Sequence, residues 1–243
     1  DTLRSGEILA IKGIGGYLLM TDATNIDAVM RLRERKLRPA KPFALIYPDV
    51  EMLKSDMVVT EQELRAWSSP ECPIVLYRFR PGIEKHLALE ALAPGLDRMG
   101  IMPPYTPLFA LITDQLQKPL VATSGNISGS PIIYEDSTAL EELRGIADLI
   151  LAHNRKIVVP QDDSVVKYSM AHGQKVVIRR SRGFAPSLLP GIVPEGYKVP
   201  TLAMGASLKS TFALWDGKRG YLSQFLGETE QLLSQDSYEH TLR

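Results

Sequence analysis

Short apolar runs alternate with amphipathic stretches from residue 8 to residue 179, and this alternation is the strongest constraint on the fold. The apolar runs predict strands and the stretches between them predict helices. The strands carry apolar residues without a polar face, as is typical of strands covered on both sides. The pattern therefore predicts an α/β or mixed α+β domain, with a mixed β-sheet flanked by helices. Strands are predicted at 8–11, 17–20, 43–47, 74–79, 99–102, 120–122, 147–151, 165–168 and 176–179, and helices at 26–36, 61–67, 108–115 and 136–144.

The composition changes after residue 183. Six prolines and glycines fall between Phe184 and Pro200, as in a linker. Strand-like runs follow at 201–204, 211–215 and 221–225, with the hairpin turn signal Asp216-Gly217 between the last two. The 43 residues from 201 to 243 are too few to build a substantial core of their own. We therefore predict a domain over 1–185, a linker over 186–200 and the start of a second domain over 201–243, in a segment of a longer protein.

Charge and cysteine content narrow the functional classes. Lys+Arg and Asp+Glu each number 28, so no global attraction to nucleic acid or membranes is implied and anion binding must come from local clusters. Cys72 is the single cysteine, which excludes an internal disulfide and fits a reducing, cytoplasmic location. No apolar run is long enough to span a bilayer. The four histidines lack metal-ligand spacing, so no metal site is predicted.

A basic cluster at a predicted helix exit is the first candidate site. Lys36, Arg38 and Lys41 lie among Pro39 and Pro42, which restrict the backbone there. Such cations can bind phosphate oxygens, Arg as a fork and Lys as a point charge. The alternative is a solvated basic face that continues Arg31, Arg33 and Arg35 of the preceding helix.

The loop over 123–131 is the second candidate. It follows an apolar strand, and its glycines would allow backbone N–H groups to surround an anion. Ser124 and Asn126 add side-chain donors. The loop lacks the Gly-Lys-Ser/Thr sequence of a Walker A motif. The alternative is a strand-to-helix connection that needs glycine for its geometry.

Two further segments are weaker candidates. Lys12-Gly13-Ile14-Gly15-Gly16 would let a ligand approach the backbone, although a tight hairpin explains it better. Asp162 and Asp163 could hold Mg²⁺ beside a triphosphate, with Arg180 or Arg182 on a phosphate. Strand-end charges in water are the alternative. No nucleophile–His pair is evident, so covalent catalysis is not predicted.

These segments, in this order, resemble the YrdC-like nucleotide-binding domain between residues 8 and 185. Lys36 to Pro39 matches its Lys-x-Arg-Pro element, and Ser124 to Asn126 its Ser-x-Asn element. A closer resemblance is to the HypF family of hydrogenase maturation carbamoyltransferases, whose actin-like domain begins with a hairpin similar to 204–212. The segments that carry this closer resemblance are 12–16, 22–25, 33–36, 104–108, 162–166 and 178–183.

The resemblance implies a function. HypF-like proteins use carbamoyl phosphate and ATP, with Mg²⁺, and form carbamoyl-adenylate and pyrophosphate in the YrdC-like domain. The carbamoyl group then passes to a C-terminal Cys of the partner HypE, for the [NiFe] centre. Zinc belongs to upstream modules that are not in this sequence. The resemblance assigns Lys36 and Arg38 to catalysis at the phosphates, Lys41, Thr123, Ser124, Asn126 and Arg180 to nucleotide binding, and Lys12 and Asp22 to the carbamate.

Two alternatives rank below this one. A double-stranded RNA-binding module would use Arg31, Arg35, Lys36 and Arg38 as a basic patch, with affinity that falls steeply with salt. A threonylcarbamoyl-adenylate synthase ranks third. Those synthases typically carry Pro-Thr-Glu where this sequence has Lys12-Gly13-Ile14, so we expect no threonylcarbamoyl-adenylate from this chain.

Overall fold

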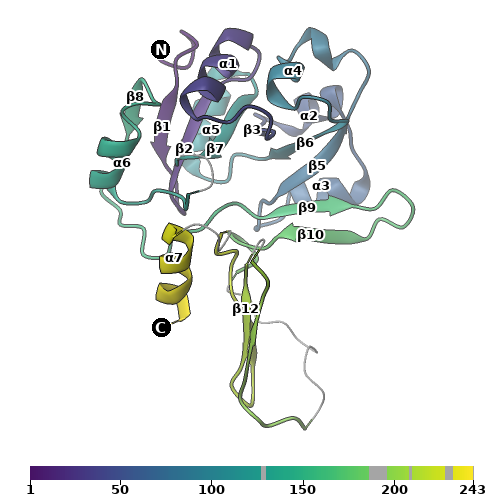
Figure 1. Cartoon of the computed structure of the whole chain (residues 1–243). Coiled ribbons are helices and arrows are strands. Elements are labelled where there is room, and N and C mark those ends of the chain that lie inside the picture. The colour runs from purple at the N-terminus through teal and green to yellow at the C-terminus, as the bar shows by residue number, and fades with distance from the viewer. Residues whose placement is uncertain (127–129, 186–195, 208–209, 228–231, 243) are drawn as a thin grey trace.

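A large mixed sheet forms the centre of the molecule (Figure 1). The computed structural model describes residues 1–126, 130–185, 196–207, 210–227 and 232–242. The strands of the large sheet are β1 (Leu9–Lys12), β2 (Tyr17–Asp22), β3 (Ala44–Ile46), β4 (Met57–Val58), β5 (Ile74–Phe79), β6 (Arg98–Met102), β7 (Leu120–Ser124), β8 (Leu149–Leu151), β9 (Val165–Tyr168) and β10 (Lys175–Arg179). The helices that accompany it are α1 (Ile26–Arg35), α2 (Val50–Asp56), α3 (Glu61–Trp67), the 3₁₀ turn Ile83–Lys85, α4 (Leu89–Leu92), α5 (Pro107–Leu116) and α6 (Asp136–Glu142).

The strand order places β7 inside the sheet, between β3 and β2. The order is β10-β9-β5-β6-β3-β7-β2-β1-β8, with β4 paired to β5. β7 is antiparallel to both β3 and β2, whereas β6 and β3, β5 and β9, and β1 and β8 are parallel pairs. The predicted fold class, a mixed sheet flanked by helices, is confirmed. Among the described residues, no helix is long and apolar enough to cross a membrane.

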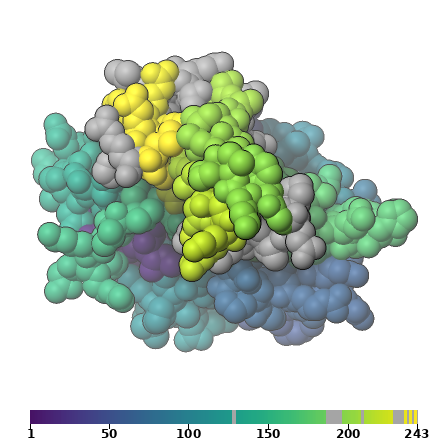
Figure 2. All heavy atoms as spheres, turned by 90° about the horizontal axis from the view of Figure 1, so that it is seen from below, coloured from purple at the N-terminus to yellow at the C-terminus, as the bar shows by residue number. Residues whose placement is uncertain are grey.

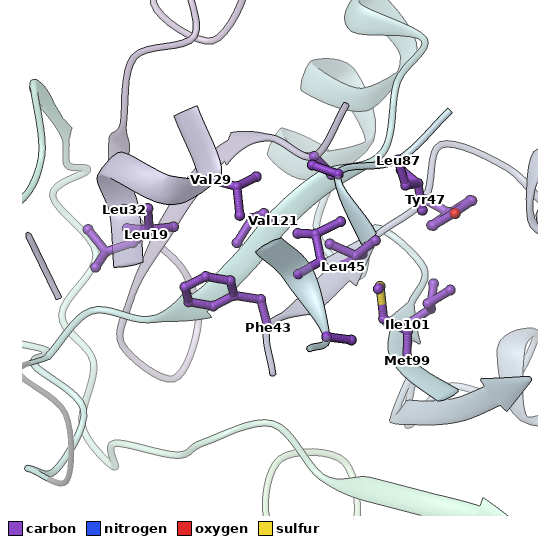
Figure 3. Close-up of a cluster of buried hydrophobic side chains, with 14 of the residues drawn as sticks. Leu19, Val29, Leu32, Phe43, Leu45, Tyr47, Leu87, Met99, Ile101 and Val121 are labelled. Carbon is purple, nitrogen blue, oxygen red and sulfur yellow. The ribbon is translucent and has the colours of Figure 1, made fainter. Parts of the chain in front are cut away.

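The central strands bury side chains on both faces. Val121 of β7 packs into one hydrophobic cluster, whereas its neighbours Leu120 and Ala122 pack into another on the opposite face. The larger cluster includes Leu32 of α1 and Leu45 of β3 (Figure 3), and Phe109 of α5 lies in the other. This arrangement explains why the strands read as continuous apolar runs.

Local capping signals fix where the helices begin. Asn25 accepts a hydrogen bond from the backbone N–H of Ala28 and caps α1, and Thr60 forms a capping box with Glu63 at α3. The helix predicted to begin with an Asp136 or Ser137 cap is different. Its N-cap is Glu135, which makes no capping bond, and Asp136 is already helical.

The second-domain residues form a small antiparallel sheet of β11 (Thr201–Met204), β12 (Phe212–Trp215) and β13 (Gly220–Leu222). It extends below the large sheet, with α7 (Leu232–Leu242) to its left in the view of Figure 1. Most of the predicted linker, residues 186–195, lies outside the described residues. β12 and β13 form the hairpin that the turn signal at Asp216-Gly217 predicts, and β11 pairs with the other edge of β12.

Candidate nucleotide site

The exit of α1 meets the end of β7, so the two candidate segments lie side by side. The Lys36 side chain is fully buried, and its Nζ donates to the backbone oxygen of Ser124 at 2.6 Å and to that of Asn126 at 2.5 Å. A third bond reaches Oδ1 of Asn126 at 2.7 Å. The two candidate segments are therefore in direct contact, and their role as one ligand site stays a prediction.

The electrostatic environment of Lys36 is unusual for a lysine. Burial, together with repulsion from Arg38 and Lys41, lowers the pKa of the Lys36 amine to about 7, and Asp162 opposes that shift. The bonded oxygens can accept all three N–H groups of an ammonium. A small gain of negative charge nearby is therefore enough to change the protonation state of this side chain near neutral pH.

Arg33 organises the basic loop after α1. It is 5% exposed, and its guanidinium donates to the backbone oxygens of Arg38 at 2.7 Å and Lys41 at 3.2 Å. Its other bonds go to the backbone oxygens of Pro39, Ala91 and Leu92. Arg33 is therefore not part of a solvated face, as the alternative interpretation held, and it restrains the loop beyond what the prolines achieve.

Arg38 lies within this loop rather than in open solvent. Its guanidinium donates to the backbone oxygens of Lys41 at 3.1 Å and Pro42 at 2.7 Å, and it lies 5.2 Å from the ring centre of Phe43. Burial and repulsion from Arg33 and Arg179 lower its pKa to about 10. Lys41 is exposed at the edge of the cluster. These cations repel one another, so an anion among them would stabilise all of them.

The loop after β7 is built against β2. The N–H of Gly125 donates to the backbone oxygen of Tyr17 at 2.6 Å, and a Cβ at Gly125 would lie 2.8 Å from that oxygen. Glycine is therefore required by the close approach. Ser124 Oγ donates to Asn126 Oδ1 at 2.8 Å, whereas Thr123 is buried within β7 opposite Leu19. Residues 127–129 of the predicted loop lie outside the described residues.

The structure brings Arg179, which the sequence did not single out, to the site. Its Nη1 lies 3.9 Å from Asp162 Oδ1, and its charge contributes to the lowered pKa of Arg38. Arg180 instead donates to the backbone oxygens of Leu222 at 2.7 Å and Ser223 at 3.2 Å. The predicted phosphate role of Arg180 therefore needs correction, since its guanidinium is bound to the second domain.

The paired carboxylates of Asp162 and Asp163 do not act together. Asp163 is buried in an ion pair with Arg182 at 2.7 Å, and Arg182 also lies 3.6 Å from the ring centre of Tyr105. Asp162 is the carboxylate that acts on Lys36 and Arg179. The suggested Mg²⁺ pair is therefore divided between a core ion pair and the site. Within the described ranges, no group of three or more His, Cys, Asp and Glu side chains could hold a metal ion.

Lys12 lies in a network at the same end of the sheet. Its Nζ, 4% exposed, is 2.7 Å from Asp136 Oδ1, which also accepts a bond of 2.7 Å from the Tyr17 hydroxyl. The amine also donates to the backbone oxygen of His153 at 3.1 Å. Lys12 and Tyr17 together lower the pKa of Asp136, while burial and Asp136 raise that of Tyr17. Tyr17 and Asp136 were missed because only the fold brings them together, 119 residues apart.

Asp22 lies at the opposite end of β2 from Tyr17, where the strand pairs with Leu120. Its carboxylate accepts bonds from Thr24 and forms an ion pair of 2.7 Å with Lys118. At about 3.3 Å per strand residue, five residues separate Asp22 from Tyr17 by about 16 Å. The interpretation that Asp22 and Lys12 serve one carbamate subsite is therefore corrected: Asp22 stabilises a turn elsewhere.

The four residues considered for RNA binding do not form one exposed basic patch. Lys36 is fully buried, and Arg35 forms an ion pair of 2.8 Å with Asp148. Arg38 is partly buried in the basic loop. RNA binding stays a prediction for which no contact in the described residues provides support.

The fold is that of a YrdC-like domain, and comparison with known proteins agrees. Residues 1–181 match the Sua5/YciO/YrdC family, described as "Telomere recombination", and the chain belongs to that family. Residues 197–243 match the HypF Kae1-like domain. The order of the two matches is the order of the two predicted domains along the chain.

The whole chain is, more particularly, similar to HypF carbamoyltransferases. It is 39% identical over 242 residues to that of Synechocystis, covering 100% of this chain and 31% of the relative, and 40% identical over 238 residues to that of Rhodobacter capsulatus, covering 97% and 31%. A crystal structure of full-length HypF in a phosphate- and nucleotide-bound form has 37% identity and a TM-score of 0.91, covering 99% of this chain and 37% of that chain. The chain thus spans about a third of the length of these relatives.

Proposed function

We propose that the first domain binds ATP between the basic loop and the loop after β7 and forms carbamoyl-adenylate from carbamoyl phosphate. The observation that carries the proposal is Lys36, a fully buried amine at the junction of the two segments, whose pKa is lowered by burial and by the charge of Arg38. The charges of Lys36, Arg38 and Arg179 outnumber that of Asp162, the carboxylate that acts on Lys36 and Arg179, so this group of residues is net positive. Its relatives are named carbamoyltransferases, and one solved relative is described as nucleotide-bound.

The proposed reaction is substitution at the α-phosphorus of ATP. Hydrolysis of carbamoyl phosphate by water first gives carbamate and inorganic phosphate, and the carbamate then attacks with a carboxylate oxygen. A new O–P bond forms, the bond to the β-phosphate oxygen breaks, and pyrophosphate leaves with the electron pair. Lys36 and Arg38 would neutralise the charge on the phosphates, and the Asn126 side chain would orient the nucleotide. Catalysis of this kind depends on positioning and charge stabilisation rather than on a protein nucleophile.

Lys12 is the residue we assign to the carbamate side. It lies at the same sheet end as Ser124, because Lys12 pairs with Tyr17 and Tyr17 accepts the N–H of Gly125. Asp136 holds the amine in place. A carbamate oxygen would compete with Asp136 for this cation, as a carboxylate of similar geometry.

Magnesium would enter as the ATP complex. Mg²⁺ usually keeps several waters and binds through one or two carboxylates plus substrate phosphates, so a dedicated cage is not required. Asp162 is the carboxylate whose charge acts on Lys36, and it would face the ion. The chemistry that Mg²⁺ supplies is neutralisation of the phosphate charge.

The longer protein would carry the carbamoyl group onward. A HypF-like function implies transfer within the Kae1-like domain to the C-terminal Cys of a HypE-type partner, for maturation of [NiFe] hydrogenase. The residues of this chain that match that domain are 197–243.

Exchange of pyrophosphate into ATP, dependent on carbamoyl phosphate, tests the proposal. We expect exchange with this chain and a loss of at least tenfold in Lys36→Ala and Arg38→Ala, since charge-assisted bonds to phosphate contribute about 1.5–3 kcal/mol each. Lys54→Ala is the matched control, because this exposed lysine pairs only with Glu51. Full exchange in both site variants would show that the site is wrongly assigned. Exchange that proceeds equally well without carbamoyl phosphate would exclude it as the co-substrate.

A further inference from the structure

A short segment of the second domain is bound to both loops that carry charges into the candidate site. We name this segment, Leu222 to Leu226, the clasp. On one side Arg180 donates to the backbone oxygens of Leu222 and Ser223, and the Phe225 N–H donates to the backbone oxygen of Arg180 at 2.6 Å. On the other side Gln224 Nε2 donates to the backbone oxygen of Pro160 at 2.8 Å. The clasp therefore ties together the chain just before Asp162 and the end of β10.

The clasp also contacts a side chain of the site. The ring of Phe225 lies 5.5 Å from the guanidinium carbon of Arg179. Arg179 is the residue whose charge lowers the pKa of Arg38, and it also reaches Asp162. Its Nε donates to the backbone oxygen of Asp163 at 2.7 Å. An aromatic ring of the other domain therefore lies within cation–π distance of this guanidinium.

The two adjacent arginines contact the clasp in different ways. Arg180 holds the clasp backbone, and Arg179 is held by the clasp side chain. Leu226, at the end of the clasp, is 4% exposed and its N–H donates to the backbone oxygen of Ser210 at 3.0 Å, which continues the contact into the small sheet. Figure 2 shows the green and yellow second-domain segments standing over the lower face of the first domain. The clasp is therefore held by hydrogen bonds at both of its ends, Leu222 and Leu226.

We propose that Phe225 is a positioning residue for the nucleotide site, which holds Arg179 so that its guanidinium faces the phosphates of ATP. This inference rests on the proposed function. The inference extends the proposed function, because it gives a residue of the second domain a part in forming the site of the first domain. An arginine between a carboxylate and an aromatic ring loses less conformational entropy when a phosphate binds, since its rotamer is already restricted.

The binding of ATP to this chain, measured by calorimetry, tests the inference. We expect Phe225→Ala to weaken ATP binding about threefold to thirtyfold, the range for a cation–aromatic contact that is partly desolvated. Phe225→Trp should restore it. The backbone bond from residue 225 to Arg180 is kept in both variants. Phe212→Ala is the matched control, because Phe212 packs against Tyr238 in the second domain and should leave ATP binding unchanged.

A double-mutant cycle separates positioning from general destabilisation. If Phe225 acts through Arg179, then the Arg179→Ala/Phe225→Ala double variant binds ATP as weakly as Arg179→Ala alone. Losses that add, or a Phe225→Ala variant that binds like the wild type, would overturn the inference and leave the proposed function intact. A wild-type chain that does not bind ATP at all would instead overturn the proposed function, and this inference with it.

Discussion

The low pKa of Lys36 predicts that ATP binding takes up a proton. Above about pH 7 the neutral amine predominates in the free protein, because burial and repulsion from Arg38 and Lys41 lower its pKa to about 7. A triphosphate beside it favours the ammonium. Above that pKa, binding must therefore pay for protonation of Lys36, and the affinity falls as the pH rises.

The size of the effect follows from the pKa. For one group, the apparent affinity falls by the factor 1 + 10^(pH − pKa), provided that the pKa in the complex stays above the working pH. Between about pH 7.5 and about pH 9.0, where ATP itself no longer titrates strongly, this predicts a loss of about 25-fold, or about 1.9 kcal/mol. Nearly one proton per ATP should be taken up at the upper pH.

Calorimetry in two buffers of different ionisation enthalpy measures both quantities. Lys36→Arg, whose guanidinium stays charged, should bind ATP with an affinity almost independent of pH in this range. Lys54→Arg, an exposed lysine paired with Glu51, should keep the slope of the wild type. A change below threefold with no proton uptake in the wild type would refute the reasoning, because Lys36 would then be charged already or would lie away from the phosphates.

Three further predictions concern stability. In Gly15→Ala a Cβ would lie 2.2 Å from the backbone oxygen of Gln161, so urea unfolding should show a loss of roughly 1–3 kcal/mol, whereas Gly145→Ala, which opens into free space, should change it by less than about 0.5 kcal/mol. Leu45 is fully buried in β3, so Leu45→Ala should lower the free energy of unfolding by about 2–5 kcal/mol. Equal stability of Leu45→Ala and of Leu111→Ala, at an exposed position, would contradict the assigned core. Lys12 and Tyr17 lower the pKa of Asp136, so the ionised carboxylate stabilises the fold above the usual carboxyl pKa, and this stabilisation is lost as the pH falls below it. Asp136→Asn should therefore lower the free energy of unfolding by about 0.5–1 kcal/mol near pH 7 and leave it unchanged near pH 2. A loss of stability that does not vary with pH would argue against the ion pair.

Local signals in the sequence predict much of the sheet and the junction of the site. α3 was predicted at its observed bounds, and the structure shows that Thr60 and Glu63 form a capping box where it begins. The meeting of Lys36 with the Ser124–Asn126 loop was also predicted. The short helices α2 and α4 were not, since four to seven residues carry little periodicity.

Non-local contacts explain what the sequence could not show about the site. The partners of Arg33 include Ala91 and Leu92, 58 and 59 residues away, so nothing near Arg33 distinguishes it from the exposed arginines of α1. The exchange of roles between Arg179 and Arg180 has another cause. The register of β10 against β9 shifts between Val177 and Arg179, so strand alternation does not predict which arginine faces the site.

The position of β7 in the sheet has a consequence for synthesis of the chain. β2 and β3 come early in the sequence but both pair with β7, which ends at Ser124. Until that segment leaves the ribosome, the inner edges of β2 and β3 have no partner, and each can pair with another chain. We therefore expect translation stalled before Leu120 to leave aggregation-prone nascent chains, whereas release of β7 gives both inner edges their partner and brings Ser124 beside Lys36.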